Sequence, residues 1–187
     1  MTTDKIFSLI AQHMVEGLMV HSQLADFYGF LSLKGYQKCH EYHYFCENKN
    51  YRDLCNYYMK HYNKLIKDQP FKNPDVISKD WYDYDRTQVE DEVRKSSIKY
   101  GMEKWISWET ETEDLYNEYI KELCDNGEVA AALKIEEYLK DTSKELDNAT
   151  QKWLEVKAID YCITEIMSHQ EEQYKKYKHK LKEIKLC

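Results

Sequence analysis

The placement of proline and glycine constrains the fold of this chain more than any other feature. Pro70 and Pro74 are its only prolines, and Gly35 and Gly127 each separate two long stretches without proline. A proline inside a helix costs about 3 kcal/mol, whereas glycine is favoured just after a helix end. The pattern therefore predicts two helical hairpins, turning near Gly35 and Gly127, that are joined by a long connection.

These signals predict an all-α chain that forms one domain over residues 1–187. The expected parts are a hairpin over 4–67, a crossover over 68–87, a second hairpin over 88–156 and a C-terminal helix over 157–187. The 60 residues after Gly127 contain neither proline nor glycine. A four-helix bundle needs only about half of them, so we expect a break near 147–158, although one kinked helix remains an alternative.

Composition narrows the classes of function. The chain is 42% hydrophobic and 33% charged, contains no long apolar run, and does not begin like a signal peptide, which predicts a cytoplasmic protein without a membrane partner. A net charge of −7 argues against nucleic acid as the main ligand. The segment 174–185 carries six lysines, and we interpret it as a solvated helix end that compensates the helix dipole.

The pattern most suggestive of chemistry is His40-x-x-His43-x-x-x-Glu47-x-x-x-Tyr51. Steps of three, four and four residues place all four side chains on one helix face, which should point into the bundle. Buried imidazole and carboxylate groups are costly unless they pair, form hydrogen bonds or bind a metal, and both suit iron, manganese or zinc. Two hypotheses follow: a metal site, or a hydrogen-bonded network without metal.

The other predicted helices carry possible metal ligands at a similar height along the bundle axis. Counting back from Gly35 places Glu47 level with His21, and the crossover length places Glu109 near the same level. On the fourth helix Glu136 leans inward but lies about 9 Å lower. The predicted metal ligands are His21, His43, Glu47 and Glu109, and the flanking candidates are Glu16, His40, Tyr51 and Glu136.

Residues 119–139, from Tyr119-Ile120-Lys121-Glu122 to Glu136-Glu137-Tyr138-Leu139, resemble the hairpin of the third and fourth helices in ferritins and mini-ferritins. The chain is similar to the ferritin-like superfamily over roughly residues 5–156. The resemblance implies a ferritin-like four-helix bundle, here with an extra C-terminal helix. It also implies a metal site inside the bundle and association of subunits.

The metal-site pattern departs from the family. The family's Glu-x-x-His on the second helix would be Glu47-Asn48-Lys49-Asn50, with asparagine in place of histidine. On the fourth helix, neither Glu136 nor Glu137 has a histidine three residues later. The mini-ferritin pattern would become His21 with His43-x-x-x-Glu47.

Two functions remain open. One is a ferritin-like metal-binding protein that oxidises or stores iron, or uses an iron or manganese pair in redox chemistry, with zinc a less favoured ion; Tyr51 would then form hydrogen bonds or take part in redox steps nearby. The other is a non-catalytic helical module that binds a protein partner without metal, as an inhibitor from a phage or mobile element would. A dimer is expected, with an interface that includes Trp81, Tyr82, Tyr84, Trp105 and Trp108.

Overall fold

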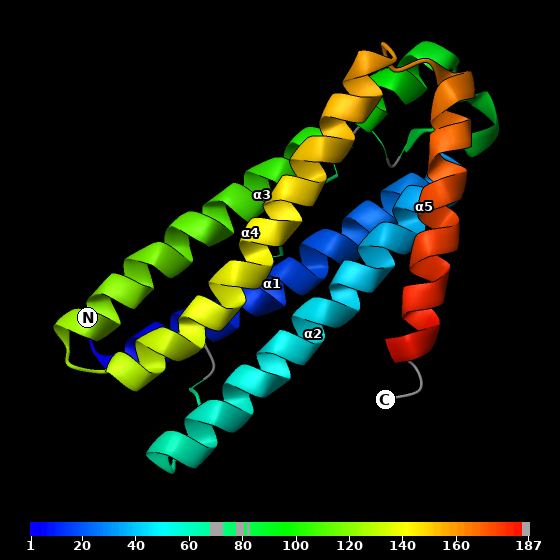
Figure 1. The fold of residues 1–187 in the computed structure, drawn as a ribbon. Helices are drawn as coiled ribbons and strands as arrows, with labels where there is room; N and C mark the ends of the chain where they lie inside the picture. The colour runs from blue at the N-terminus through cyan, green and yellow to red at the C-terminus, as the bar shows by residue number, and fades with distance from the viewer. Residues whose placement is uncertain (68–72, 78–80, 82, 185–187) are drawn as a thin grey trace.

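The computed structural model describes residues 1–67, 73–77, 81 and 83–184. The described residues contain no β-strand, which confirms the predicted all-α class (Figure 1). They form five α-helices and one short 3₁₀ helix: α1 (Thr3–Phe30), α2 (Lys34–Tyr62), η2 (Arg86–Gln88), α3 (Asp91–Asp125), α4 (Val129–Ala158) and α5 (Ile163–Ile184).

The helices pair in the order of the chain. α1 packs against α2 and α3 against α4, each pair being an antiparallel hairpin. α2 ends at one end of the bundle and α3 begins at the opposite end, so that the connection between them returns along the bundle (Figure 1). α5 then turns back and packs against α2.

The first turn does not lie at Gly35. α1 ends at Phe30, and Ser32 supplies the left-handed residue of the turn, with φ 63°. Gly35 lies inside the first turn of α2, where a Cβ atom would stand 1.9 Å from the backbone oxygen of Gln170 in α5. The prediction was therefore wrong about this glycine, which permits a close approach of two helices. Gly127, with φ 78°, does form the second turn as predicted.

The other helix ends also differ from the expected bounds. α2 ends at Tyr62, where Asn63 adopts a left-handed conformation, so the crossover begins about five residues earlier than expected. α4 continues to Ala158, so the expected break falls at the end of the range 147–158. The chain turns at Asp160 and Tyr161, which both have positive φ and cannot continue a right-handed helix. Two separate helices therefore follow Gly127.

The described part of the crossover is held against α1 and α3. The Gln23 side-chain amide donates to the carbonyl of Pro74 at 2.8 Å and accepts from the backbone N–H of Val76 at 3.1 Å. The Tyr100 hydroxyl donates to the Val76 carbonyl at 2.7 Å. Trp81 packs edge-on against the ring of Phe27, with ring centroids 5.1 Å apart. These contacts fix the connection along the bundle.

Some predictions about the surface need correction or lie outside the described residues. Trp105 is fully buried, so the prediction that it forms part of a dimer interface was wrong, whereas Tyr84 is exposed. Pro70, Tyr82 and 185–187 lie outside the described residues. Among the helices that are described, none has a stretch long and apolar enough to cross a bilayer.

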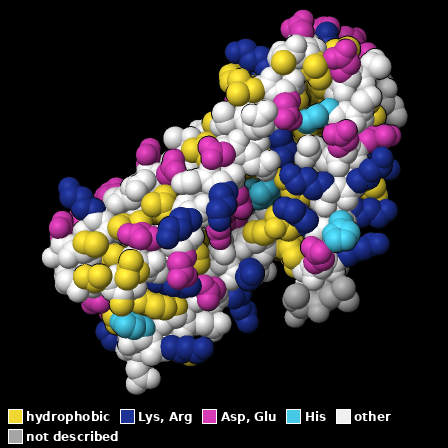
Figure 2. Space-filling view, viewed as in Figure 1, with side chains coloured by type: hydrophobic (Ala, Val, Ile, Leu, Met, Phe, Trp, Pro, Cys, Tyr) yellow, Lys and Arg dark blue, Asp and Glu magenta, His cyan; other side chains and the backbone are white. Residues whose placement is uncertain are grey.

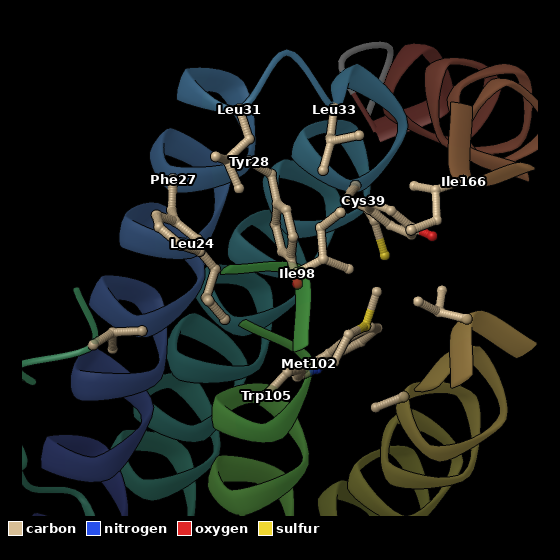
Figure 3. Close-up of a cluster of buried hydrophobic side chains, with 14 of the residues drawn as sticks. Leu24, Phe27, Tyr28, Leu31, Leu33, Cys39, Ile98, Met102, Trp105 and Ile166 are labelled. Atoms are coloured by element: carbon tan, nitrogen blue, oxygen red, sulfur yellow. The ribbon is translucent and has the colours of Figure 1, made fainter. Parts of the chain in front are cut away.

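The core consists of two apolar clusters separated along the bundle. One surrounds Leu24, Tyr28, Met102 and Trp105 near the α1–α2 turn (Figure 3). The other includes Ile10 and lies towards the α3–α4 turn. On α2, α3 and α4 the residues between the two clusters include a buried polar side chain, and on α1 the buried His21 directly follows Val20 of the first cluster. The fold therefore places a polar layer of imidazole and carboxylate groups at the boundary between the two apolar clusters.

Candidate metal centre

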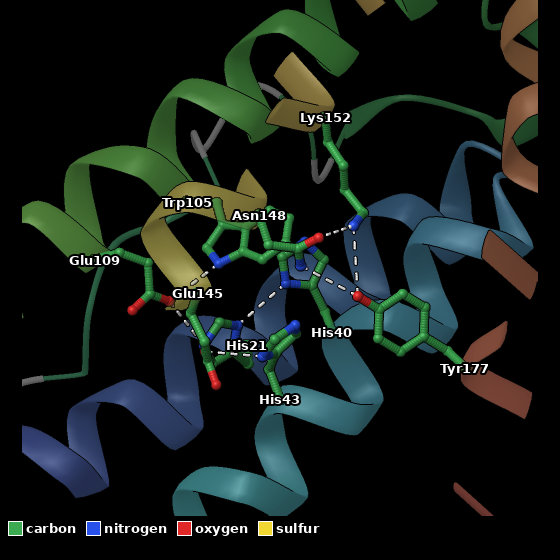
Figure 4. Close-up of polar contacts among 9 residues, drawn as sticks. All are labelled: His21, His40, His43, Trp105, Glu109, Glu145, Asn148, Lys152 and Tyr177. Atoms are coloured by element: carbon green, nitrogen blue, oxygen red, sulfur yellow. Dashed lines mark hydrogen bonds and ion pairs between the residues drawn. The ribbon is translucent and has the colours of Figure 1, made fainter. Parts of the chain in front are cut away.

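Four helices contribute imidazole or carboxylate groups to this polar layer. His21 comes from α1, His43 from α2, Glu109 from α3 and Glu145 from α4 (Figure 4). The exposed fraction is 0% for His21, 1% for Glu109 and 3% for His43. Glu47, one helical turn beyond His43, is also buried. The layer thus combines carboxylate oxygen and imidazole nitrogen ligands in a largely buried site.

The candidate ligand atoms lie close enough to one another for several of them to bind one metal ion. His21 Nε2 is 3.5 Å from Glu109 Oε1, and His43 Nδ1 is 2.8 Å from Glu145 Oε2. His21, Glu109 and Glu145 each offer one ligand atom, and these three atoms lie within 4.8 Å of one another. Metal–ligand bonds to nitrogen and carboxylate oxygen measure about 2.0–2.2 Å, so ligand atoms of one ion lie at most about 4.4 Å apart. The 3.5 Å separation falls within this limit, and small side-chain movements would bring the whole group within it.

Several of these atoms have no hydrogen-bond partner among the described residues. They are His21 Nε2, both ring nitrogens of His43, and Glu145 Oε2. The 2.8 Å contact between His43 and Glu145 is therefore an ion pair whose angles fall outside hydrogen-bond geometry. His21 Nε2 has only its 3.5 Å contact with Glu109, and His43 Nε2 has no hydrogen-bond partner among the described residues. A buried polar atom without a partner costs about 1–3 kcal/mol, so these two nitrogens favour a bound ligand.

Neighbouring side chains orient the ligands. His21 Nδ1 lies 3.1 Å from His40 Nδ1, and Trp105 Nε1 donates a hydrogen bond to Glu109 Oε1 at 3.0 Å. If His21 Nδ1 carries the proton of that imidazole pair, its Nε2 presents a lone pair towards Glu109. Metal-binding histidines are commonly held in this way, by donation from the other ring nitrogen. His40 is thus placed to orient His21.

Two carboxyl groups resist ionisation in the metal-free layer. Burial raises the pKa of Glu47 and that of Glu109 well above the usual range, and repulsion from the Glu145 carboxylate raises both further. Carboxylates that share a dry site cannot all ionise without a compensating cation. A divalent ion would supply that charge and allow the protons to leave.

His43 and Glu145 behave as a charged pair. Burial lowers the pKa of His43, but the carboxylate of Glu145 and the thiol of Cys39 outweigh it, so that the pKa lies well above the usual value. Burial raises the pKa of Glu145, yet His43 more than offsets this and the net shift is downward. Metal binding at His43 must therefore displace a proton, and affinity should fall as the pH falls.

The other layer histidines are neutral near pH 7. Burial, and then repulsion from His43, lowers the pKa of His21 to about 3. Burial also lowers the pKa of His40 well below its usual value, with repulsion from His21 adding to it. A neutral imidazole is the form that binds metal. His21 needs no deprotonation to act as a ligand.

One histidine outside the layer provides a test of burial. His13 Nε2 lies 2.7 Å from Thr112 Oγ1, and burial lowers the pKa of His13 from 6.5 to about 4. The unfolded chain therefore takes up the proton first, and stability is lost as the pH falls from about 6.5 to about 4. Between pH 7 and pH 5, the free energy of unfolding of wild type should therefore fall by about 2 kcal/mol more than that of His13→Gln. Urea unfolding at the two pH values measures this difference. Equal pH dependence in both proteins would contradict the burial of this ring.

Of the four predicted ligands, the structure groups His21 and Glu109 with Glu145 and places His43 beside Glu145, whereas Glu47 lies one helical turn further along α2. A Cβ on Gly17 would lie 3.5 Å from Glu47 Cδ, so Glu47 is level with Gly17 and not with His21. His21 instead stacks on His43, with ring centroids 5.3 Å apart. The count from Gly35 failed because the turn is centred on Ser32.

The remaining candidates lie elsewhere. Glu16 accepts a hydrogen bond from the Gln12 amide at 2.9 Å and is not part of the cluster. Tyr51 packs against the apolar cluster that surrounds Ile10. Glu136 is nine residues before Glu145 on α4, a rise of about 13 Å along the helix. Neither Glu16 nor Glu136 belongs to the group of ligand atoms on His21, Glu109 and Glu145.

The sequence analysis missed Glu145. Gly127 forms the α3–α4 turn, and Glu109 and Glu145 each lie eighteen residues from it along the chain. Counting outwards from that glycine would have paired the two residues across the hairpin. The signal was present in the sequence, but Glu136 was preferred for its orientation alone.

Comparison of the chain with protein-family models, with curated proteins and with solved structures finds no match.

Proposed function

We propose that this chain is a metal-binding helical bundle of ferritin-like type, which holds iron or manganese between its four long helices. His21, His43, Glu47, Glu109 and Glu145 would be the ligands. The observation that carries this proposal is the convergence of buried imidazole and carboxylate groups from four helices, in which His21, Glu109 and Glu145 each offer one ligand atom within 4.8 Å of the others. In addition, His43 Nε2 has no hydrogen-bond partner among the described residues.

The composition of the ligand set favours particular ions. Three carboxylates and two imidazoles are hard to borderline ligands that suit iron and manganese. No cysteine is within the group of His21, Glu109 and Glu145 that the described residues form. One carboxylate from each of several helices is also how bundles build sites for metal pairs, which support redox and oxygen chemistry.

The arrangement of the helices supports the ferritin-like part of the proposal. Two antiparallel hairpins are joined by a connection that returns along the bundle, as in that superfamily. The ligand pattern is this chain's own, because Glu47 is followed three residues later by Asn50 and not by the histidine of the family's Glu-x-x-His. We therefore propose metal binding first, and iron oxidation, iron storage or other redox chemistry as the activities that it would serve.

Metal titration tests the proposal. Metal-free protein, prepared with a chelator, is titrated without oxygen with Fe(II) or Mn(II), and bound metal is measured after gel filtration. We expect about one or two ions per chain, and an increase in unfolding free energy of about 2.7 kcal/mol at a hundredfold excess over Kd. Mg(II), which keeps its waters and avoids imidazole, serves as the control and should bind far more weakly.

Absence of retained metal, together with unchanged thermal unfolding, would contradict the proposal. In that case the module that binds a protein partner would become the better account of this bundle.

A further inference from the structure

A cavity opens beside the polar layer, between α2, α4 and α5. Its volume is about 370 Å³, and His43 and Glu145 form part of its wall. The opposite wall comes from α5, through Lys176, Tyr177 and Lys180. A volume of this size is at the lower end of the range for small-molecule sites. The cavity thus connects the proposed metal ligands to solvent.

Four lysines surround this cavity on a chain whose net charge is −7: Lys49, Lys144, Lys176 and Lys180. Lys144 pairs with Asp141 at 3.0 Å. Lys176 and Lys180 instead lie over the ring of Tyr177, at 5.3 and 5.4 Å from its centroid. Within the described part of the chain, neither of these two ammonium groups forms an ion pair with a carboxylate. They are available to an incoming anion.

Figure 2 shows the same character on the surface, where Lys and Arg side chains gather over α5. The lysine-rich C-terminal segment was interpreted from sequence as a solvated helix end. In the structure it packs against α2 and contributes two lysines to the cavity wall. Position and charge together give this segment a role beyond helix-end solvation.

The inner wall of the cavity carries polar groups as well. The His43 ring lines the cavity and is 3% exposed; its Nδ1 faces Glu145 Oε2 at 2.8 Å, and its Nε2 has no hydrogen-bond partner among the described residues. Asn148, also in the lining, donates its amide to the Tyr177 hydroxyl at 3.2 Å and accepts from the buried Lys152 at 2.6 Å. The inner wall is therefore polar and ordered, and the outer wall is cationic.

We propose that this cavity binds a small organic anion, carrying a carboxylate or phosphate group, between the α5 lysines and the metal centre. The inference rests on the proposed function, because it names the substrate class of the same site. The anionic group pairs with Lys176 and Lys180, and the rest of the molecule reaches His43 and Glu145. A cation is disfavoured by the lysines, and a nucleic acid by the size of the cavity and the charge of the chain.

The test measures anion binding at low salt in metal-free and Mn(II)-loaded protein. The probes are inorganic phosphate and succinate, with choline as a cation of similar size. Titration calorimetry compares wild type with Lys176→Ala/Lys180→Ala. The matched control, Lys178→Ala/Lys182→Ala, removes the same charge from two exposed lysines of α5 that do not line the cavity.

We expect at least one anion to bind wild type, and the cavity variant to bind it about tenfold more weakly. The control variant should change affinity by less than about twofold, and Lys176→Arg/Lys180→Arg should retain binding. In Mn(II)-loaded protein the anion should change the Mn(II) resonance spectrum of wild type. Equal losses in the cavity and control variants, or no binding of either anion, would overturn the proposal.

Failure of this inference can be told from failure of the proposed function. Metal uptake without anion binding overturns the anion site and leaves the metal site standing. Anion binding by a protein that takes up no metal overturns the metal site, and with it the substrate role of the anion.

Discussion

Replacing Glu145 by glutamine should lower the affinity of the chain for Mn(II) by at least about 100-fold. Glutamine preserves the size of the side chain but removes the negative charge that faces His43 at 2.8 Å. It also removes a ligand atom that lies within 4.8 Å of those of His21 and Glu109. Bound Mn(II), measured by metal analysis after equilibrium dialysis, reports the loss.

Glu136→Gln provides the matched control for this experiment. Glu136 is on the same helix and partly buried, but it lies about 13 Å along the helix from Glu145. The control should bind Mn(II) within about twofold of wild type. Equal effects of the two variants would show that α4 supplies its ligand elsewhere, and undiminished binding in Glu145→Gln would remove this residue from the site.

Gly35→Ala should destabilise the fold by about 3 kcal/mol. A Cβ at this position would lie 1.9 Å from the backbone oxygen of Gln170, and a backbone atom cannot move aside as a flexible side chain can. The Gly35 N–H also donates to Gln170 Oε1 at 2.6 Å, a bond that the displaced helix would lose. Urea unfolding measures the change, and α5 should become more susceptible to proteolysis.

Gly29→Ala is the control, because Gly29 is also helical and lies near the same turn. There the nearest atoms to an added Cβ are the side-chain amide atoms of Gln37, at 3.1–3.3 Å, which can move. Alanine is also the better helix former by about 1 kcal/mol. The control should therefore unfold no more easily than wild type. A Gly35→Ala protein as stable as this control would mean that α5 does not approach α2 so closely.

The helical architecture could be predicted because few residues interrupt it. Long segments without proline or glycine favour helix by local propensity, and Gly127 marks its turn in the expected way. The α1–α2 turn could not be located, because Ser32 adopts the left-handed conformation that glycine usually provides. The role of Gly35 depends on contact with Gln170, which is 135 residues away and leaves no local signal.

The candidate site was partly predictable for a related reason. Helical spacing identified His43 and Glu47 as sharing a face, and both are buried in the polar layer. Which residues of two paired helices lie side by side depends on the centre of the turn between them. The turn is centred on Ser32, three residues before Gly35, so Glu47 lies beside Gly17 and not beside His21. Ion pairing between His43 and Glu145 is a property of packing between α2 and α4, which helix periodicity does not encode.

The position of bound metal tests the central claim most directly. Crystals of the wild-type protein loaded with Mn(II) or Fe(II) would be measured at the absorption edge of that metal, where anomalous scattering locates the ion. The account predicts density between His21, His43, Glu109 and Glu145, at about 2.0–2.2 Å from their ligand atoms. A fully loaded crystal with no anomalous density in this layer, or with metal only at surface carboxylates, would contradict it.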